Sequence, residues 1–285
     1  MAPSVAVIIR TKNEEEFIRE TLEAVCAQTK KPDEIIVVDS GSCDNTLQIA
    51  SHFETIVVQI EPEEFTYGRA LNIGFERASS DLLVSLSADA QPADENWLAK
   101  LTGALKDART AGVYGRQIAG PRTNLSEKRD LQIRYGTERK VQSEDYFFSN
   151  VNSAIKKEVW NRIRFSESIA GAEDWDWARR VQEEGHVVVY EPDAAVFHSD
   201  DDAFMAAYRR MKRVTCGVAS LDPSLRVSLE QVLVETAIQT VLDMRFIARS
   251  GMNLRSMFYS PFYRLARSMG RYRGVHYGKR ASHTD

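Results

Sequence analysis

Two acidic stretches hold the residues of this sequence whose types and spacing are best suited to chemistry. Ser87-Ala88-Asp89-Ala90 follows the apolar run Leu82–Leu86, and Glu173-Asp174-Trp175-Asp176-Trp177 comes later in the chain. Open α/β sheets bind ligands outside the carboxyl ends of their strands, so Asp89 stands where a ligand is expected. One carboxylate that holds a metal–diphosphate and another that acts as a base would together make a group-transfer enzyme.

The elements that position Asp89 alternate between strand and helix over the first 120 residues. Amphipathic segments predict helices that start near Asn13, Asn45, Tyr67 and Asp94, with Asn13 as an N-cap. Such alternation implies right-handed crossovers and a mostly parallel sheet flanked by helices, which is an α/β fold. Four apolar runs predict the buried strands of that sheet: Val5–Ile9, Glu34–Val38, Thr55–Ile60 and Asp81–Leu86.

The pattern becomes mixed after Gly112. Charge and turn residues dominate Gly120–Ser143 and predict a mobile loop or lid. After Asp200 the pattern is helical to about Ala248, and the remaining residues predict an amphipathic, basic segment. Between these parts we expect three short strands and one helix: Gly112–Gly115, Val187–Tyr190, Ala194–Phe197 and the helix Trp175–Glu184.

Charge is divided unevenly along the chain, although the net charge is only −4. From Met244 onward there are nine Lys/Arg and one acid, while the preceding residues carry 28 basic and 40 acidic side chains. An acidic main body argues against nucleic-acid binding. The hydrophobic content of 43% and the charged content of 27% are ordinary for a soluble globular protein.

Cysteine usage and the N-terminus bear on the expected compartment. Cys26, Cys43 and Cys216 form no CxxC pair, so we expect neither a disulfide framework nor a zinc cluster. The N-terminus lacks the basic start and the length of a signal peptide. No apolar run approaches the ~20 residues that span a bilayer. We therefore expect a cytoplasmic protein without a transmembrane segment.

Two common phosphate-binding loops are absent from the sequence. The first turn, Arg10-Thr11-Lys12-Asn13-Glu14, contains no glycine and so lacks the G-x-G-x-x-G cradle of dinucleotide-binding proteins. No G-x-x-x-x-G-K-[ST] loop occurs either. Nicotinamide-dependent enzymes and kinases of these types are therefore not expected.

Polar side chains instead follow successive strands of the predicted sheet. Asp39 offers the acceptor that a base N–H needs, and Arg69 offers a fork to a phosphate. Asp89 is a hard oxygen ligand suited to Mg²⁺ or Mn²⁺ that bridges a diphosphate. Each residue also has a plainer alternative, since Asp39 would cap a turn and Asp89 a helix. In chain order, the residues at strand ends are Thr11 and Asn13, Asp39 and Ser40, Arg69, and Asp89.

Several motifs in the expected order resemble family 2 glycosyltransferases of GT-A fold over roughly residues 4–200. The nucleotide-binding start is Val5–Ile9 with Arg10-Thr11-Lys12-Asn13-Glu14, then Ile35–Ser42 and Asp44-Asn45-Thr46. The likeness continues through Gly68-Arg69-Ala70-Leu71-Asn72, Asp89, Val113–Gln117, Glu173-Asp174 and Tyr190–Asp193. Leu86–Pro92, together with Tyr114–Gln117, is most similar to the rhamnosyltransferase branch.

This resemblance implies an inverting transfer of a sugar from a nucleotide-diphosphate donor, assisted by a divalent metal. It places Asp89 on the metal, Mg²⁺ or Mn²⁺, and Arg69 near the diphosphate. Around the nucleoside and the rest of the donor it places Thr11, Asn13 or Glu14, Asp39, Ser40 and Ala88.

One departure from the family concerns the metal site. Where many relatives have D-x-D, this chain has Ser87-Ala88-Asp89, so one carboxylate is replaced by a weaker ligand. His198, at the end of an apolar run, is a candidate further ligand, and the alternative is a histidine that merely ends a strand. The lost carboxylate also leaves open a non-catalytic subunit that binds a nucleotide sugar or acts as a scaffold.

The second acidic stretch supplies the predicted base. Inverting transfer needs a carboxylate that removes the proton of the acceptor hydroxyl. The Asp of the family's E-D motif has that role, so the resemblance assigns it to Asp174, with Glu173 as the fallback. The alternative is that Glu173, Asp174 and Asp176 form the acidic first turn of a helix. Trp175 and Trp177 cannot face the same way on a helix, so at most one floors a sugar site.

We divide the chain into a GT-A catalytic domain, 1–200, and a helical basic C-terminal extension, 201–285. Within the first, 1–118 is the nucleotide-sugar-binding half and 119–200 the acceptor-side half. The extension has two interpretations. It is a packed helical pair with its arginines on the solvated side, or it contacts an anionic leaflet or another copy of the chain.

The sequence therefore predicts a metal-dependent inverting glycosyltransferase. We favour a dTDP-rhamnose donor over a UDP-linked sugar, and a glycan or lipid-linked acceptor at the inner face of the membrane. Besides the non-catalytic subunit, the rival is a nucleotidyltransferase, which shares the α/β fold. Its glycine-rich, basic signature loop after the first strand is absent here.

Overall fold

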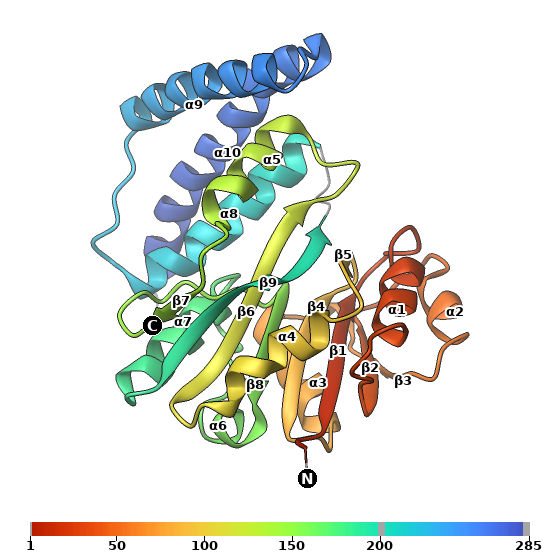
Figure 1. Ribbon diagram of the computed structural model, residues 1–285. Coiled ribbons are helices and arrows are strands. Elements are labelled where there is room, and N and C mark those ends of the chain that lie inside the picture. The colour runs from red at the N-terminus through yellow and green to blue at the C-terminus, as the bar shows by residue number, and fades with distance from the viewer. Residues whose placement is uncertain (1, 199–202, 282–285) are drawn as a thin grey trace. The chain divides into compact units, whose positions relative to one another are not determined.

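The computed structural model describes residues 2–198 and 203–281, and the chain divides into two compact units (Figure 1). The first, the sheet unit, comprises Met1–Ile118, Tyr135–Ser168 and Glu173–His198. The second, the helical unit, comprises Ala119–Arg134, Ile169–Ala172 and Ser199–Asp285. Neither unit is continuous in sequence, and the functional division at residue 200 stays a prediction.

The sheet unit is built on a mixed sheet. Among the described residues its strands are β1 (Val5–Thr11), β2 (Glu34–Asp39), β3 (Ile56–Gln59), β4 (Leu82–Ser87), β5 (Ala90–Pro92), β6 (Thr110–Ala119), β7 (Lys140–Gln142), β8 (Asn152–Lys156) and β9 (Val187–His198). Their order is β3-β2-β1-β4-β8-β6-β9-β5, and β7 pairs with β9. The pairs among β3, β2, β1 and β4 are parallel, whereas β4–β8, β6–β8, β5–β9 and β7–β9 are antiparallel.

The predicted α/β class is confirmed, with one difference. The parallel order stops at β4, because β8 runs back alongside it. Residues Val5–Ile9 are each 0% exposed, as a continuous apolar run predicts for a strand covered on both faces. The helices of this unit are α1 (Ile18–Cys26), α2 (Thr46–Ala50), α3 (Tyr67–Arg77), α4 (Trp97–Gly103), α6 (Lys157–Arg162) and α7 (Glu173–Glu183).

Two sequence predictions about local structure are wrong. The segment Gly120–Ser143 is not simply a loop, because it contains the helix α5 (Leu125–Arg134) and the strand β7. Asn13 does not cap α1, because that helix begins only at Ile18. The backbone of Asn13 has a left-handed φ of 55°. An asparagine tolerates that conformation better than most residues, and here it serves a turn.

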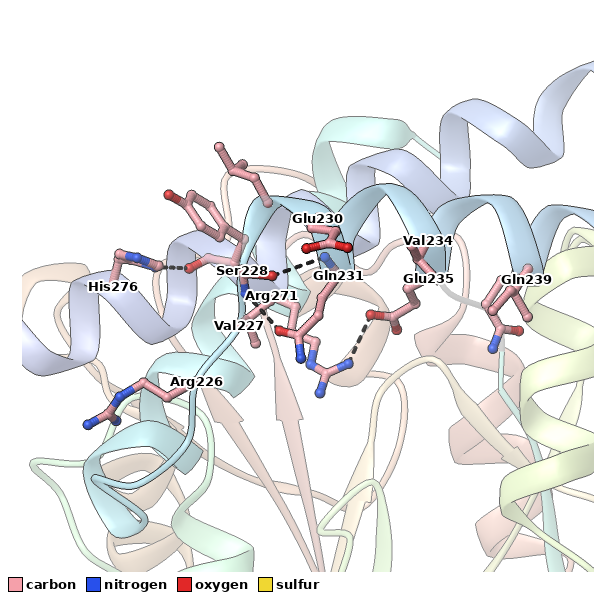
Figure 2. A pocket seen from close by; sticks show the side chains of 13 residues that line it. Arg226, Val227, Ser228, Glu230, Gln231, Val234, Glu235, Gln239, Arg271 and His276 are labelled. Atoms are coloured by element: carbon pink, nitrogen blue, oxygen red, sulfur yellow. Dashed lines mark hydrogen bonds and ion pairs between the residues drawn. The ribbon is translucent and has the colours of Figure 1, made fainter.

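The helical unit consists of α5 together with three long helices: α8 (Phe204–Leu221), α9 (Leu229–Arg249) and α10 (Leu254–Ala281). A capping box of Ser228 and Gln231 starts α9 (Figure 2). Gly270 of α10 lies so close to α8 that a Cβ there would stand 2.5 Å from the carbonyl oxygen of Tyr208. Within the described residues, no helix is long and apolar enough to cross a membrane.

The interior of the helical unit contains ion pairs as well as apolar contacts. Arg264 is only 4% exposed and lies 2.7 Å from both Asp243 and Asp130. Arg267 lies 2.7 Å from Glu127. One interpretation of the tail placed its arginines on the solvated side, and for Arg264 that is wrong. Burying a guanidinium is tolerable only because carboxylates surround it.

Candidate active site

The carboxyl ends of β2, β1 and β4 bring polar residues to one edge of the sheet. Parallel pairing sets Thr11 beside Asp39 and Arg10 beside Ser87. Because β8 runs antiparallel to β4, the start of β8 meets the same edge, and Ser87 N–H donates to the carbonyl of Val151. This edge therefore brings together β1 and the start of β8, which lie about 140 residues apart in the sequence.

Asp89 and His198 form a pair at this edge. Asp89 lies two residues after the end of β4, and the pairing of Ala90 with His198 joins β5 to the end of β9. His198 Nε2 lies 3.3 Å from Asp89 Oδ2, and the two side chains are 9% and 22% exposed. Burial alone would raise the pKa of Asp89, but the charge and hydrogen bond of His198, with a smaller contribution from Arg10, hold that pKa below its ordinary value.

The pair has donor atoms and spacing that suit one divalent ion. Two ligands at right angles on an octahedral Mg²⁺, with bonds of ~2.1 Å, stand ~3 Å apart. The separation of 3.3 Å between Asp89 Oδ2 and His198 Nε2 is close to that value. No group of three His, Cys, Asp or Glu side chains that could hold a metal occurs in the described ranges.

A second acidic group lies at the start of α7. Asp174 accepts hydrogen bonds from the backbone N–H groups of Trp175 at 2.9 Å and Asn150 at 3.4 Å. Burial and the charge of Glu173 raise the pKa of Asp174 to about 8, against the lowering effect of the two N–H groups and of Arg10. A carboxyl group with such a pKa exchanges its proton near the pH at which enzymes work.

Arg10, like Asn150, is a residue of this site that sequence reasoning did not single out. Its side chain is 12% exposed, its Nη1 lies 4.0 Å from Glu173 and its guanidinium stacks over Tyr67 at 5.4 Å. It also donates to the carbonyl of Asn150 at 3.5 Å. The sequence feature that could have indicated Arg10 is its position directly after the five apolar residues Val5–Ile9 of a predicted buried strand.

Several buried polar atoms at this edge have no hydrogen-bond partner among the described residues. They are Arg10 Nε and Nη1, Asn150 Nδ2 and Thr11 Oγ1. More than nine in ten buried polar groups in proteins are hydrogen-bonded, so a cluster of such atoms indicates a polar ligand. Most of these atoms are donors, which favours a ligand rich in oxygen acceptors.

The loop after β2 is held by Asp39. This fully buried carboxylate accepts from Gly41 N–H and Ser42 N–H, both at 3.0 Å, and from Ser42 Oγ at 2.5 Å. Asn13 Oδ1 accepts from Cys43 N–H at 2.8 Å, and Ser40 N–H donates to the carbonyl of Thr11. Asp39 thus caps a turn, which was its plainer interpretation. Its contact with a nucleoside stays a prediction.

Position 41 of this loop accommodates only glycine without strain. Its φ is +84°, and an added Cβ would stand 2.6 Å from Pro62 Cγ. We expect Gly41→Ala to lower the free energy of unfolding by about 1–3 kcal/mol in urea denaturation. Gly103→Ala is the matched control, because Gly103 is helical and has open space around it. It should instead stabilise by about 0.5–1 kcal/mol; equal effects of the two would contradict the strain at Gly41.

Three further predicted donor-binding residues are also placed by the structure. Arg69 pairs with Glu64 at 3.0 Å and with Glu167 at 3.5 Å, and its place near a diphosphate stays a prediction. Burial and the charges of Asp89 and Asp44 raise the pKa of Glu14 to about 8, so Glu14 lies within electrostatic reach of Asp89. Ala88 is buried, and its carbonyl accepts from Thr21 Oγ1 at 2.8 Å.

The two tryptophans of α7 have different surroundings. Trp177 is 0% exposed, and its Nε1 donates to the carbonyl of Ile163 at 2.8 Å, so it belongs to the core. Trp175 is partly exposed and meets the edge of Phe147 at 5.7 Å. Of the two tryptophans, only Trp175 therefore remains as a candidate aromatic surface on which a sugar could pack.

Comparisons with a protein-family model and with known sequences both find similarity to glycosyltransferases. The family model described as "Glycosyl transferase family 2" matches residues 6–164. The O-antigen chain rhamnosyltransferase WbaN of Salmonella anatum is 31% identical over 209 residues, which cover 69% of this chain and 66% of that protein. RfbN of Salmonella typhimurium, also an O-antigen chain rhamnosyltransferase, is 29% identical over 68% of this chain and 66% of its own length. The chain thus spans slightly less than two thirds of these relatives.

Solved structures share the fold at low sequence identity. The mannosyltransferase PcManGT from Pyrobaculum calidifontis, in complex with GDP-Man and Mn²⁺, has a TM-score of 0.64 at 20% identity, covering 100% of this chain and 89% of its own. Glucosyl-3-phosphoglycerate synthase from Mycobacterium tuberculosis, in complex with Mn²⁺ and UDP-glucose, has a TM-score of 0.55 at 19% identity, covering 77% and 79%.

Proposed function

Because this chain belongs to glycosyl transferase family 2, we propose that it transfers a sugar from a nucleotide-diphosphate donor to a hydroxyl group, with inversion at the anomeric carbon. The observation that carries the proposal is the shared edge of β1, β4 and β8. There the pair of Asp89 and His198, a carboxyl group of raised pKa and buried donors without partners among the described residues come together. A nucleotide-diphosphate sugar supplies the acceptor oxygens that these donors lack.

The donor's negative charge would be met by a divalent ion and by a guanidinium. Asp89 and His198 would hold the divalent ion, which neutralises charge on the diphosphate as it leaves. Arg10 Nε and Nη1 would donate to the diphosphate or to sugar hydroxyls, since a guanidinium fork matches such oxygens. The proposal needs no second carboxylate of a D-x-D motif, because the imidazole of His198 would supply one ligand to the ion.

Asp174 would act as the general base. The acceptor oxygen attacks the anomeric carbon while the bond from that carbon to the diphosphate oxygen breaks, and the bonding electrons stay with the diphosphate. Asp174 takes the proton that the acceptor hydroxyl loses. Proton transfer of this kind contributes about 10²–10⁴-fold to a rate. Glu173 lies next to Arg10, which suits it better to holding that arginine in place.

Within this activity we propose rhamnose as the sugar, dTDP as the carrier, and a glycan or lipid-linked acceptor. The relatives named as O-antigen chain rhamnosyltransferases support this choice. We retain the cytoplasm as the proposed location and an oligomeric state as a prediction.

The proposed activity can be tested with a panel of dTDP-, UDP- and GDP-sugars in the presence of Mn²⁺. We expect release of the nucleotide diphosphate with one donor above all others, increased by an acceptor. Donor binding without any release would favour the non-catalytic subunit. Release of inorganic pyrophosphate from a nucleoside triphosphate would instead favour a nucleotidyltransferase.

Arg10 should control the pH dependence of transfer. It lowers the pKa of Asp174, and Asp174 must be ionised to accept a proton. We expect the acid limb of kcat/KM to move to a pH about 1 higher in Arg10→Met, as when a carboxylate loses a neighbouring cation. Arg10→Lys keeps the charge and should restore most of the wild-type limb. Identical limbs in all three proteins would contradict this role.

A further inference from the structure

The first turns of α10 expose a stripe of large apolar residues. Leu254, Phe258, Phe262 and Leu265 are 67%, 75%, 61% and 41% exposed. Their spacing of four, four and three residues places them on one face of the helix. We call these four residues the apolar stripe.

Neighbouring aromatic residues extend the stripe beyond α10. Phe204, at the start of α8, stacks on Tyr259 with ring centroids 4.6 Å apart and lies 6.0 Å from Phe262. Phe204 is itself 38% exposed, and Met252, just before α10, is 66% exposed. Contiguous exposed apolar surface of this kind marks a site of interaction.

Over its first turns, α10 has polar residues on its buried face and apolar residues on its exposed face. The buried face of the helix carries Arg264 and Ser260, which bind Asp243 at 2.7 and 2.6 Å. The exposed face carries phenylalanine and leucine. An ordinary surface helix has the opposite arrangement, so the outer face of α10 suits a surrounding that is less polar than water.

The charges around the stripe indicate the kind of partner. Arg245, Arg249 and Arg255 are exposed near the connection from α9 to α10, and the sequence holds no acid between Met244 and Thr284. A second copy of the chain would bring these arginines against their equivalents, whereas anionic headgroups would neutralise them. We propose that the apolar stripe and its arginines dock on an anionic lipid leaflet, with the phenylalanines at the headgroup boundary.

The groove near the start of α9 is a different kind of surface. Glu230 and Glu235 line this groove (Figure 2). Its volume is about 1040 Å³. Arg271 is already paired with Glu235 at 2.9 Å. An anionic leaflet would be repelled by these carboxylates. The lipid contact is therefore assigned to the apolar stripe and its arginines, and not to this groove.

Flotation of the full-length protein with vesicles tests the proposal without donor or acceptor, so its failure would leave the proposed transfer untouched. We expect binding to vesicles of phosphatidylcholine with 30% phosphatidylglycerol, about the share that makes a leaflet strongly anionic, and little binding to phosphatidylcholine alone. Each arginine near the surface contributes about fivefold, so Arg245→Glu, Arg249→Glu and Arg255→Glu together should weaken binding about 100-fold or more.

Matched variants separate docking from general loss of fold. Phe258→Ser with Phe262→Ser should weaken binding at least ~10-fold, because two insertions are lost. Ile133→Ser, at an equally exposed site on α5, and Arg19→Glu, on the surface of α1, should bind like the wild type. Wild-type binding by the stripe variants overturns the proposal. So does a dimer in sedimentation that the Phe258→Ser and Phe262→Ser changes abolish, since the stripe would then face a second copy.

Discussion

Replacing Asp174 by asparagine is expected to lower kcat for sugar transfer by roughly 10²–10⁴-fold and to leave donor binding largely unchanged. The amide keeps the size of the side chain and can still accept from the N–H of Trp175, but it cannot take a proton. The donor-binding groups lie on other elements, at the ends of β1 and β4. Single-turnover rates and donor titration by calorimetry would measure the two effects separately.

The same variant should make the stability of the protein depend less on pH. Its pKa is raised from 3.8 to about 8 in the fold, so the unfolded chain releases this proton at lower pH than the native protein does. Stability contributed by the protonated group is therefore full below about pH 4 and is lost as pH rises towards 8. We expect the melting temperature of Asp174→Asn to fall less steeply than that of the wild type over this range.

Asp176 provides a control on the same helix. It is 4% exposed and accepts from Arg179 at 3.0 Å and Arg180 at 2.8 Å, so its role is to hold α7. Asp176→Asn should lower the melting temperature and keep most of the turnover. If Asp176→Asn loses as much turnover as Asp174→Asn, the base is not Asp174, and the acidic first turn serves the helix alone.

The strands and helices of the first half could be predicted because their pattern is local. Val5–Ile9 and its parallel neighbours are continuous apolar runs, and such runs predict buried strands without knowledge of their partners. The strand β8 gives no such signal, since Asn152 and Ser153 are polar. It is stabilised by tertiary contacts instead, and Asn152 accepts from Trp97 Nε1 at 2.9 Å.

Glu173 and Asp174, at the start of α7, could be predicted only from their resemblance to the family's E-D motif, whereas other residues of the candidate site could be predicted because they end a recognised strand. Thr11, Asp39 and Asp89 were found this way. The roles of Arg10 and Asn150 depend on a contact between residues 140 positions apart, which no local pattern contains. Asp39 shows that position at a strand end does not by itself indicate ligand binding, because its carboxylate accepts hydrogen bonds from its own loop.

Replacing Asp89 by asparagine is expected to weaken Mn²⁺ binding in the presence of a nucleotide diphosphate by at least ~100-fold, and transfer with it. Loss of a second-layer partner of a metal ligand already costs about 10–100-fold in affinity, and a direct carboxylate ligand should cost no less. Positions 87 and 88 are serine and alanine, so no neighbouring carboxylate can replace Asp89. His198→Ala should weaken Mn²⁺ binding too, but less, because it removes a neutral ligand and leaves the charge of Asp89.

Calorimetry or electron paramagnetic resonance of Mn²⁺ measures this loss without any turnover. Asp94→Asn is the control, since Asp94 pairs with Lys100 at 2.7 Å on the surface of the same unit. It should bind Mn²⁺ like the wild type. Unchanged Mn²⁺ affinity in Asp89→Asn, together with full transfer, would mean that the pair of Asp89 and His198 is a strand-end contact. The low pKa of Asp89 would then come from an ordinary ion pair, and the ion, if the reaction uses one, would be held by the diphosphate and by other groups at the edge of the sheet.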